Sequence, residues 1–155
     1  MKVLIVGCGR VGAFLAGLLD QGGHEVTIVD LDRGSFVHLP QSFKGTTLLG
    51  NGTDMDVLRD AGIDKVDAFL ALTQGDNRNL MAAQVAKEIF GVKQVIAKVN
   101  DPMRANIYRR HGIGTFSRTS IIGTLLEAML MGDPEVGKIL VERAKTHEAA
   151  LVEAR

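Results

Sequence analysis

The chain has one cysteine, no tryptophan, one tyrosine and no net charge over its 155 residues. A single cysteine cannot form an internal disulfide, so the chain fits a reducing, cytoplasmic compartment. Its 18 basic and 18 acidic residues create no positive field for nucleic acid or for an anionic membrane surface. No apolar run approaches the length of a membrane-spanning helix, and the first run is too short for a signal peptide. We expect no nucleic-acid partner and no direct membrane insertion, so a membrane role would go through a partner protein.

The residues that catalysis or metal binding would need are also scarce. The four histidines are scattered, and none pairs with a carboxylate or the cysteine at ligand spacing, so we expect no metal site. A dehydrogenase needs a substrate pocket and a proton donor beside its cofactor, which a second domain or long insertions usually supply. The sequence contains neither, so we expect no enzyme. An NAD-dependent oxidoreductase fragment remains the alternative.

A glycine motif near the start of the chain is the strongest positive feature. The apolar run Val3 to Val6 leads into Gly7-Cys8-Gly9-Arg10-Val11-Gly12. After a strand and before a helix, this pattern allows a tight turn, a close approach to a pyrophosphate and close helix packing. A second apolar run ends at Asp30, where a carboxylate can bind both hydroxyls of a ribose. The motif with Asp30 therefore predicts a bound adenine nucleotide.

Apolar runs alternate with helical patterns along residues 1–132, which predicts a Rossmann-like α/β fold with a doubly wound, parallel, six-stranded sheet in the order 3-2-1-4-5-6. The length favours one domain. We expect strands at residues 2–6, 25–30, 46–50, 68–72, 95–99 and 115–117. We expect helices at residues 11–21, 35–40, 55–61, 76–90, 102–111 and 121–131. Residues 133–155 are expected to form a C-terminal helical extension or the start of a missing second domain.

Several residues at the strand ends have two interpretations. Asp54 and Asp101 are expected to be ordinary helix caps. Asn51 follows the third strand, where an adenine edge would lie, and either touches the base or serves the turn. Cys8 is either a reactive thiol near a helix start or a small filler. Arg10 is either a clamp for a terminal phosphate or a solvated surface residue.

These features together resemble the N-terminal nucleotide-binding domain of RCK proteins, which regulate potassium conductance and include the Trk and Ktr uptake regulators. The resemblance covers approximately residues 1–131. It is carried by four motifs, namely the glycine loop, Gly50-Asn51-Gly52-Thr53-Asp54, Asp67-Ala68-Phe69 leading to Thr73 with Asp76-Asn77 and Asn79, and Val95-Ile96-Ala97-Lys98-Val99-Asn100-Asp101-Pro102.

The resemblance implies a cytoplasmic domain, peripheral to the inner face of the membrane, that senses NAD(H) or ATP/ADP. It implies a homodimer or a larger RCK ring that gates a membrane potassium-transporting subunit. The helices at 76–90 and 121–131 are the candidate dimer surfaces, and the alternative is that their leucine, methionine and alanine residues belong to the core. A scaffold subunit that binds no nucleotide is a further alternative. The implied nucleotide-binding residues are Gly7, Cys8, Gly9, Arg10, Val11, Asp30, Leu31, Asn51, Gly52, Thr73, Gln74 and Lys98.

Overall fold

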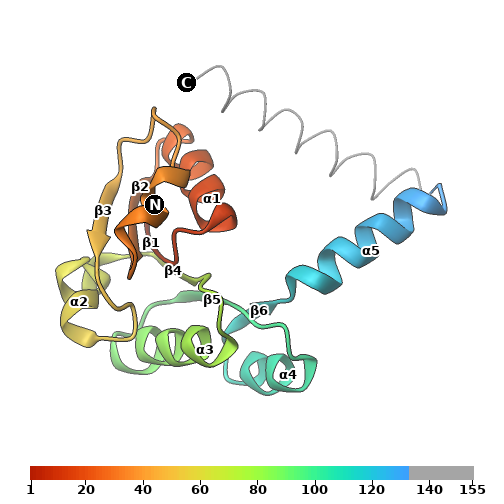
Figure 1. The fold of residues 1–155 in the computed structure, drawn as a ribbon. Coiled ribbons are helices and arrows are strands. Elements are labelled where there is room, and N and C mark those ends of the chain that lie inside the picture. The colour runs from red at the N-terminus through yellow and green to blue at the C-terminus, as the bar shows by residue number, and fades with distance from the viewer. Residues whose placement is uncertain (133–155) are drawn as a thin grey trace.

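The computed structural model describes residues 1–132. They form six parallel strands in the order β3-β2-β1-β4-β5-β6, which confirms the predicted sheet (Figure 1). The strands are β1 (Lys2–Val6), β2 (Glu25–Asp30), β3 (Thr46–Leu49), β4 (Ala68–Ala71), β5 (Gln94–Lys98) and β6 (Gly114–Phe116). The helices are α1 (Arg10–Gln21), α2 (Met55–Asp60), α3 (Asp76–Gln84), α4 (Pro102–Arg110) and α5 (Arg118–Leu130). The extension predicted for residues 133–155 lies outside the described residues.

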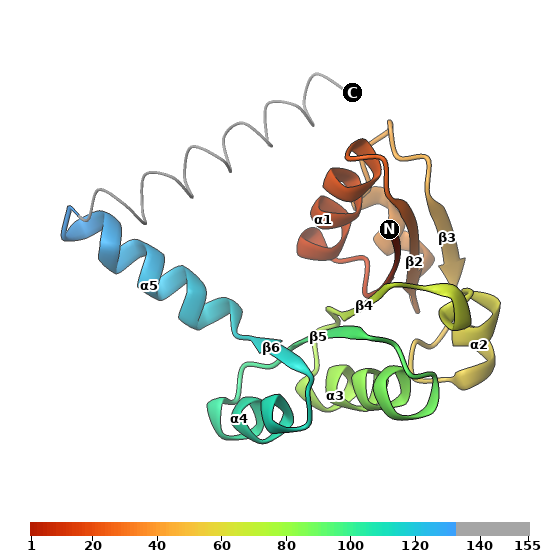
Figure 2. The ribbon, with the colours of Figure 1, turned by 180° about the vertical axis from the view of Figure 1, so that it is seen from behind.

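Alternating side chains of the strands build two hydrophobic layers, one on each face of the sheet. On one face, Val3 and Ile5 of β1 pack with Ala13 and Ala16 of α1. On the other face, side chains of β1, β4 and β5 pack with α2, α3 and α4, including Leu4, Val6, Leu58, Phe69, Leu80 and Ala105. Figures 1 and 2 show this division, with α1 on one side of the sheet and α2 and α3 on the other. Parallel strands covered on both faces explain the continuous apolar runs of the sequence.

Two predicted helices differ in helix type from the structure. The helix expected at 35–40 is a 3₁₀ helix, η1 (Arg33–His38), which starts earlier because the Asp32 side chain caps it by accepting from the Gly34 N–H at 2.9 Å. The helix expected at 76–90 is α-helical only to Gln84 and continues as a π-helical turn, η3 (Val85–Ile89). The Phe90 N–H then donates to the Val85 carbonyl at 3.2 Å, which accommodates one extra residue in the last turn. A short 3₁₀ turn, η2 (Ile63–Lys65), was not predicted.

Helix α5 follows β6 directly and extends away from the sheet (Figures 1 and 2). It starts three residues before the predicted residue 121, because the Ser117 side chain caps it by accepting from the Ser120 N–H at 3.2 Å. No residue of α5 is buried in the described part of the chain. None of the helices in residues 1–132 combines the length and apolar character needed to cross a bilayer.

Candidate functional site

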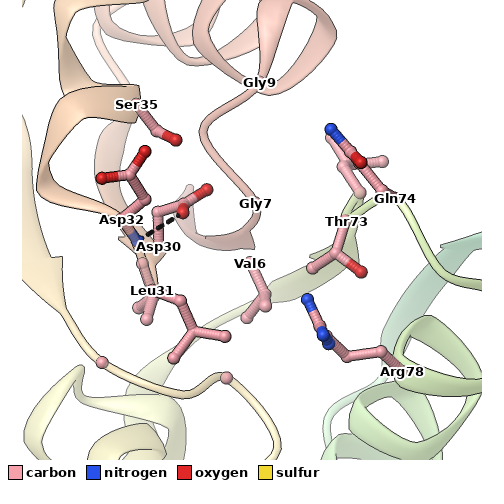
Figure 3. Close-up of a pocket in the computed structure, with 14 residues that line it drawn as sticks. Val6, Gly7, Gly9, Asp30, Leu31, Asp32, Ser35, Thr73, Gln74 and Arg78 are labelled. Carbon is pink, nitrogen blue, oxygen red and sulfur yellow. Dashed lines mark hydrogen bonds between the residues drawn. The ribbon is translucent and has the colours of Figure 1, made fainter.

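A pocket of about 300 Å³ lies at the carboxyl ends of β1, β2 and β4 (Figure 3). In a doubly wound sheet of this order, the connections from the two central strands leave toward opposite faces, so a crevice opens at this edge. The volume falls at the lower end of the range of small-molecule sites. The lining residues are Val6, Gly7, Gly9, Val29, Asp30, Leu31, Asp32, Ser35, Gly50, Gly52, Leu72, Thr73, Gln74 and Arg78.

The glycine loop between β1 and α1 brings backbone to the pocket wall at places where a side chain would not fit. Gly7 has a φ of +108°, and a Cβ there would lie 2.8 Å from the Thr73 backbone nitrogen. A Cβ on Gly12 would lie 2.0 Å from the Gly7 carbonyl oxygen, so the first turn of α1 packs directly on the loop. Gly9 lines the pocket, and a Cβ there would meet nothing within 4 Å. The loop therefore has the shape that an approaching phosphate needs.

Two helices begin at the pocket without a side-chain cap. Gly9 precedes α1 and Gly75 precedes α3, and neither can supply a capping oxygen. By contrast, Asp54, Asp101 and Ser117 cap α2, α4 and α5 with their side chains, which confirms the two predicted aspartate caps. The first N–H groups of a helix need an acceptor, and the helix dipole favours a negative one. An anionic group in the pocket would accept hydrogen bonds from the first N–H groups of α1.

Asp30 joins the glycine loop to the end of β2. One carboxylate oxygen accepts from the Cys8 N–H at 2.6 Å, and the other accepts from the Asp32 N–H at 2.9 Å. A carboxylate offers about four acceptor positions, so it retains capacity for two hydroxyl groups of a ligand. Asp30 therefore holds the loop in place and faces the pocket at the same time (Figure 3).

The opposite wall of the pocket is held by the buried side chain of Asn79. Its oxygen accepts from the Thr73 N–H at 2.8 Å and from the Thr73 hydroxyl at 2.6 Å. Its amide nitrogen donates to the carbonyl oxygens of Thr73 and Lys98 at 3.1 and 2.9 Å. Asp76 adds a second link, because its carboxylate accepts from the N–H groups of Asn100 and Asp101. These bonds fix the loop after β4 and the first turn of α3 against the end of β5.

Two ionisable groups near the site have shifted pKa values. Burial, and then the negative charge of Asp30, raises the pKa of the Cys8 thiol from 9.0 to about 11. The thiol is fully buried and stays protonated at neutral pH, which favours the filler interpretation over a reactive thiol. Burial, and then the positive charge of Arg118, lowers the pKa of Lys98, while Asp76 opposes that shift.

The predicted site residues divide into two groups. Gly7, Gly9, Asp30, Leu31, Gly52, Thr73 and Gln74 come together around the pocket. Cys8, Arg10, Val11, Asn51 and Lys98 do not line it; their contacts with a ligand stay predictions. The Cys8 side chain is fully buried, and Arg10 and Val11 are exposed at the start of α1. The Asn51 side chain accepts from the N–H and hydroxyl of Thr53, so it serves the turn. Lys98 is buried at the end of β5.

The sequence interpretation missed three polar residues that line the pocket, Asp32, Ser35 and Arg78. Asp32 and Ser35 follow β2 closely, so the rule that residues after strand ends face the crevice could have included them. Arg78 lies in the first turn of α3 and had no such signal. Figure 3 shows its side chain directed into the pocket, opposite Leu31.

Comparison with known proteins finds a family model, the TrkA-N domain, that matches residues 3–118. The chain is 50% identical over 115 residues to the Trk system potassium uptake protein TrkA of Streptomyces coelicolor, covering 74% of this chain and 52% of the relative. It is 33% identical over 108 residues to a TrkA homolog of Pyrococcus abyssi, covering 70% and 48%. The chain thus spans about half the length of the curated relatives that it matches.

Three solved structures share the fold at low sequence identity. The TrkA-N domain of the inner membrane protein ybaL from Escherichia coli has a TM-score of 0.74 at 16% identity, covering 83% of this chain and 96% of that one. The Kef CTD of Shewanella denitrificans in its AMP-bound form has a TM-score of 0.66 at 20% identity, covering 99% and 97%. The GsuK channel bound to NAD has a TM-score of 0.65 at 22% identity, covering 79% and 22%. At these identities the likeness shows the fold alone.

Proposed function

Because the chain belongs to the TrkA-N domain family, we propose that it is a nucleotide-sensing regulatory subunit, or part of one, in a potassium uptake system or channel. In this proposal the pocket binds NAD(H) or ATP/ADP, and the bound nucleotide gates a potassium-transporting membrane partner. The domain is cytoplasmic and reaches the membrane through that partner. The ligand acts by binding two states of the assembly with different affinity, without being chemically changed.

One arrangement carries the proposal: the uncapped start of α1 and the carboxylate of Asp30 face the same pocket. The first favours an anionic group and the second favours hydroxyl donors. A nucleotide contains both, as a phosphate joined to a ribose. The AMP-bound Kef CTD and the NAD-bound GsuK channel support an adenine nucleotide as the ligand class.

The names of the relatives support regulation of potassium transport. Both curated relatives described above are Trk system potassium uptake proteins or their homologs, and their matched regions cover 70% or more of this chain. GsuK is itself a channel. These relatives favour a non-enzymatic role over an oxidoreductase fragment.

We also propose that the domain assembles as a homodimer or a larger ring, with α5 among its contact surfaces. Large apolar side chains of α5 are exposed, including Ile122 at 48% and Leu126 at 53%. On α3, Met81 is 54% exposed. Clusters of exposed apolar side chains of this kind often mark protein–protein contacts.

Calorimetric titration with NADH, NAD, ATP, ADP and AMP tests nucleotide binding. We expect saturable binding of at least one of them. Asp30→Asn should lower the affinity by about tenfold or more, because it removes the negative charge of the carboxylate that accepts from the ribose hydroxyls. Asp60→Ala, on the exposed end of α2, controls for the loss of one negative charge. Melting curves establish that Asp30→Asn remains folded. Absence of binding to all five nucleotides in the wild-type protein would refute the sensor proposal and favour a scaffold.

The proposed role of Arg10 has a separate test. If its guanidinium clamps a terminal phosphate, Arg10→Ala weakens ATP binding by about tenfold and leaves AMP binding nearly unchanged. Equal losses for ATP and AMP would exclude the clamp.

Regulation of transport is tested in the native organism. Deleting the gene should change rubidium uptake, which reports potassium transport, and the wild-type gene should restore it. The Asp30→Asn gene, expressed at the same level, should fail to restore the dependence of rubidium uptake on the nucleotide concentration in the cell. Unchanged uptake after deletion would refute the link to transport.

A further inference from the structure

We infer that Arg78 forms one wall of the slot for the nucleotide base, opposite Leu31, and that it recognises the base by stacking. This inference rests on the proposed function, because it assigns one part of the same pocket to one part of the ligand. It concerns a residue that the family resemblance did not bring into the site.

The position of the base follows from the positions proposed for the rest of the ligand. The phosphates belong at the glycine loop, near Gly9, and the ribose belongs at Asp30. Figure 3 shows Gly9 and Asp30 in that order, with Leu31 and Arg78 farther from Gly9 and on opposite sides of the pocket. A nucleotide that runs from the loop past Asp30 therefore places its base between Leu31 and Arg78.

The two side chains offer suitable faces for a planar base. Leu31 is 53% exposed and presents an apolar surface at the pocket. The guanidinium of Arg78 is planar and cationic, and such a group stacks well on an aromatic ring. Val6 lies between the two walls in Figure 3. Gly52 also lines the pocket, and a Cβ there would lie 2.1 Å from Val6 Cγ1, so glycine backbone packs against this short side chain.

Arg78 is also available for a ligand. Within residues 1–132 it makes no hydrogen bond or ion pair, whereas Arg59 and Arg104 pair with Asp56 and Asp101. Its backbone is held firmly, because Asn79 and Asp76 anchor the same helical turn to Thr73 and to the end of β5. A functional side chain on an anchored helix turn is positioned more accurately than one on a free loop.

The alternative role for the Arg78 guanidinium is contact with a phosphate group of the nucleotide. The two roles predict different dependence on the ligand. A stacking residue affects every ligand that has a base by the same factor, whatever its number of phosphates. A phosphate contact has a larger effect on ATP than on AMP, and it is largely preserved by lysine, which keeps the charge without the planar group.

The experiment measures dissociation constants for AMP, ATP and ribose 5-phosphate in the wild type, Arg78→Ala and Arg78→Lys. We expect Arg78→Ala to weaken AMP and ATP equally, by about three- to tenfold, as cation–π contacts do. Arg78→Lys should lose most of the same affinity. Ribose 5-phosphate has no base and should bind the wild type and both variants alike. Arg110→Ala, at the exposed end of α4, controls for the loss of one positive charge.

A double-mutant cycle with Leu31→Ala sharpens the result. If both side chains contact one base, their effects on AMP binding should be coupled and not additive. Unchanged AMP binding in Arg78→Ala, a greater loss for ATP than for AMP, or full affinity in Arg78→Lys would each overturn the stacking role while leaving the proposed function intact. Failure of the wild type to bind any nucleotide would overturn both.

Discussion

Helices α1 and α5 are similar in length, at 12 and 13 residues, and opposite in burial. α1 buries four small residues, Gly12, Ala13, Ala16 and Gly17, against the sheet. α5 buries none within the described chain and exposes isoleucine, leucine and methionine side chains. Small residues allow the close approach that shapes the pocket, whereas large exposed ones offer area to another surface. The difference fits the two proposed roles, with α1 at the proposed ligand site inside the domain and α5 at the proposed contact surface outside it.

The largest effect is expected for Gly12→Ala in α1. The new Cβ would lie 2.0 Å from the Gly7 carbonyl oxygen, and backbone atoms cannot move aside as a flexible side chain can. We expect the free energy of unfolding to fall by about 3 kcal/mol or more, with loss of the pocket. Denaturant unfolding followed by circular dichroism measures the change. A loss below about 1 kcal/mol would contradict the tight packing of α1 on the loop.

On α5, the pair Ile122→Glu and Leu126→Glu should act on assembly and spare the fold. The two residues are four apart and share a helix face. Placing unpaired charges in an interface should weaken self-association by about 100-fold, because their desolvation is not compensated. Sedimentation velocity measures the association, and melting at low concentration tests the fold. An unchanged association constant would remove α5 from the proposed contact surface.

The buried thiol of Cys8, in the loop before α1, should make the stability of the fold depend on pH. Its pKa of about 11 in the folded protein exceeds 9.0, so folding favours the protonated thiol. The resulting stability is fully present below pH 9 and is lost as the pH rises from 9 toward 11, by up to about 2 kcal/mol. Unfolding curves at pH 8 and pH 10.5, compared with Cys8→Ala, isolate the thiol from the lysines and Tyr108. Equal pH dependence in the two proteins would show that the thiol is not desolvated.

The features that could be predicted from the sequence are those that local patterns determine. The bounds of β1 and β2 were predicted correctly, because each buried aliphatic run is followed by a glycine loop or an aspartate. The glycine loop and Asp30 were predicted to bind the phosphates and the ribose of one nucleotide, and the structure brings them together through the Cys8–Asp30 hydrogen bond. Such local patterns were sufficient because the strand order brings the carboxyl ends of β1 and β2 side by side.

The pocket residues that the sequence did not predict are brought there by contacts between segments that are distant in the chain. Arg78 and Leu31 face one pocket only because β4 pairs with β1, and no spacing in the sequence relates them. The π-helical end of α3 was missed because one inserted residue leaves the apolar pattern of residues 76–90 nearly intact. For α5 the sequence left two alternatives open, a dimer surface or core, since its apolar residues suit both, and only the structure shows them exposed.

The smallest effect is expected for Gly123→Ala, the matched change to Gly12→Ala on the other helix. A Cβ on Gly123 would meet nothing within 4 Å, and alanine favours a helix over glycine. We therefore expect α5 to be stabilised by up to about 1 kcal/mol, measured as a slightly higher melting temperature, with unchanged nucleotide binding. Sedimentation of the same variant shows whether Gly123 lies where two helices cross, because there an added methyl group would weaken association. Destabilisation of the isolated domain by more than about 1 kcal/mol would mean that α5 packs on its own sheet, and the contrast with α1 would no longer hold.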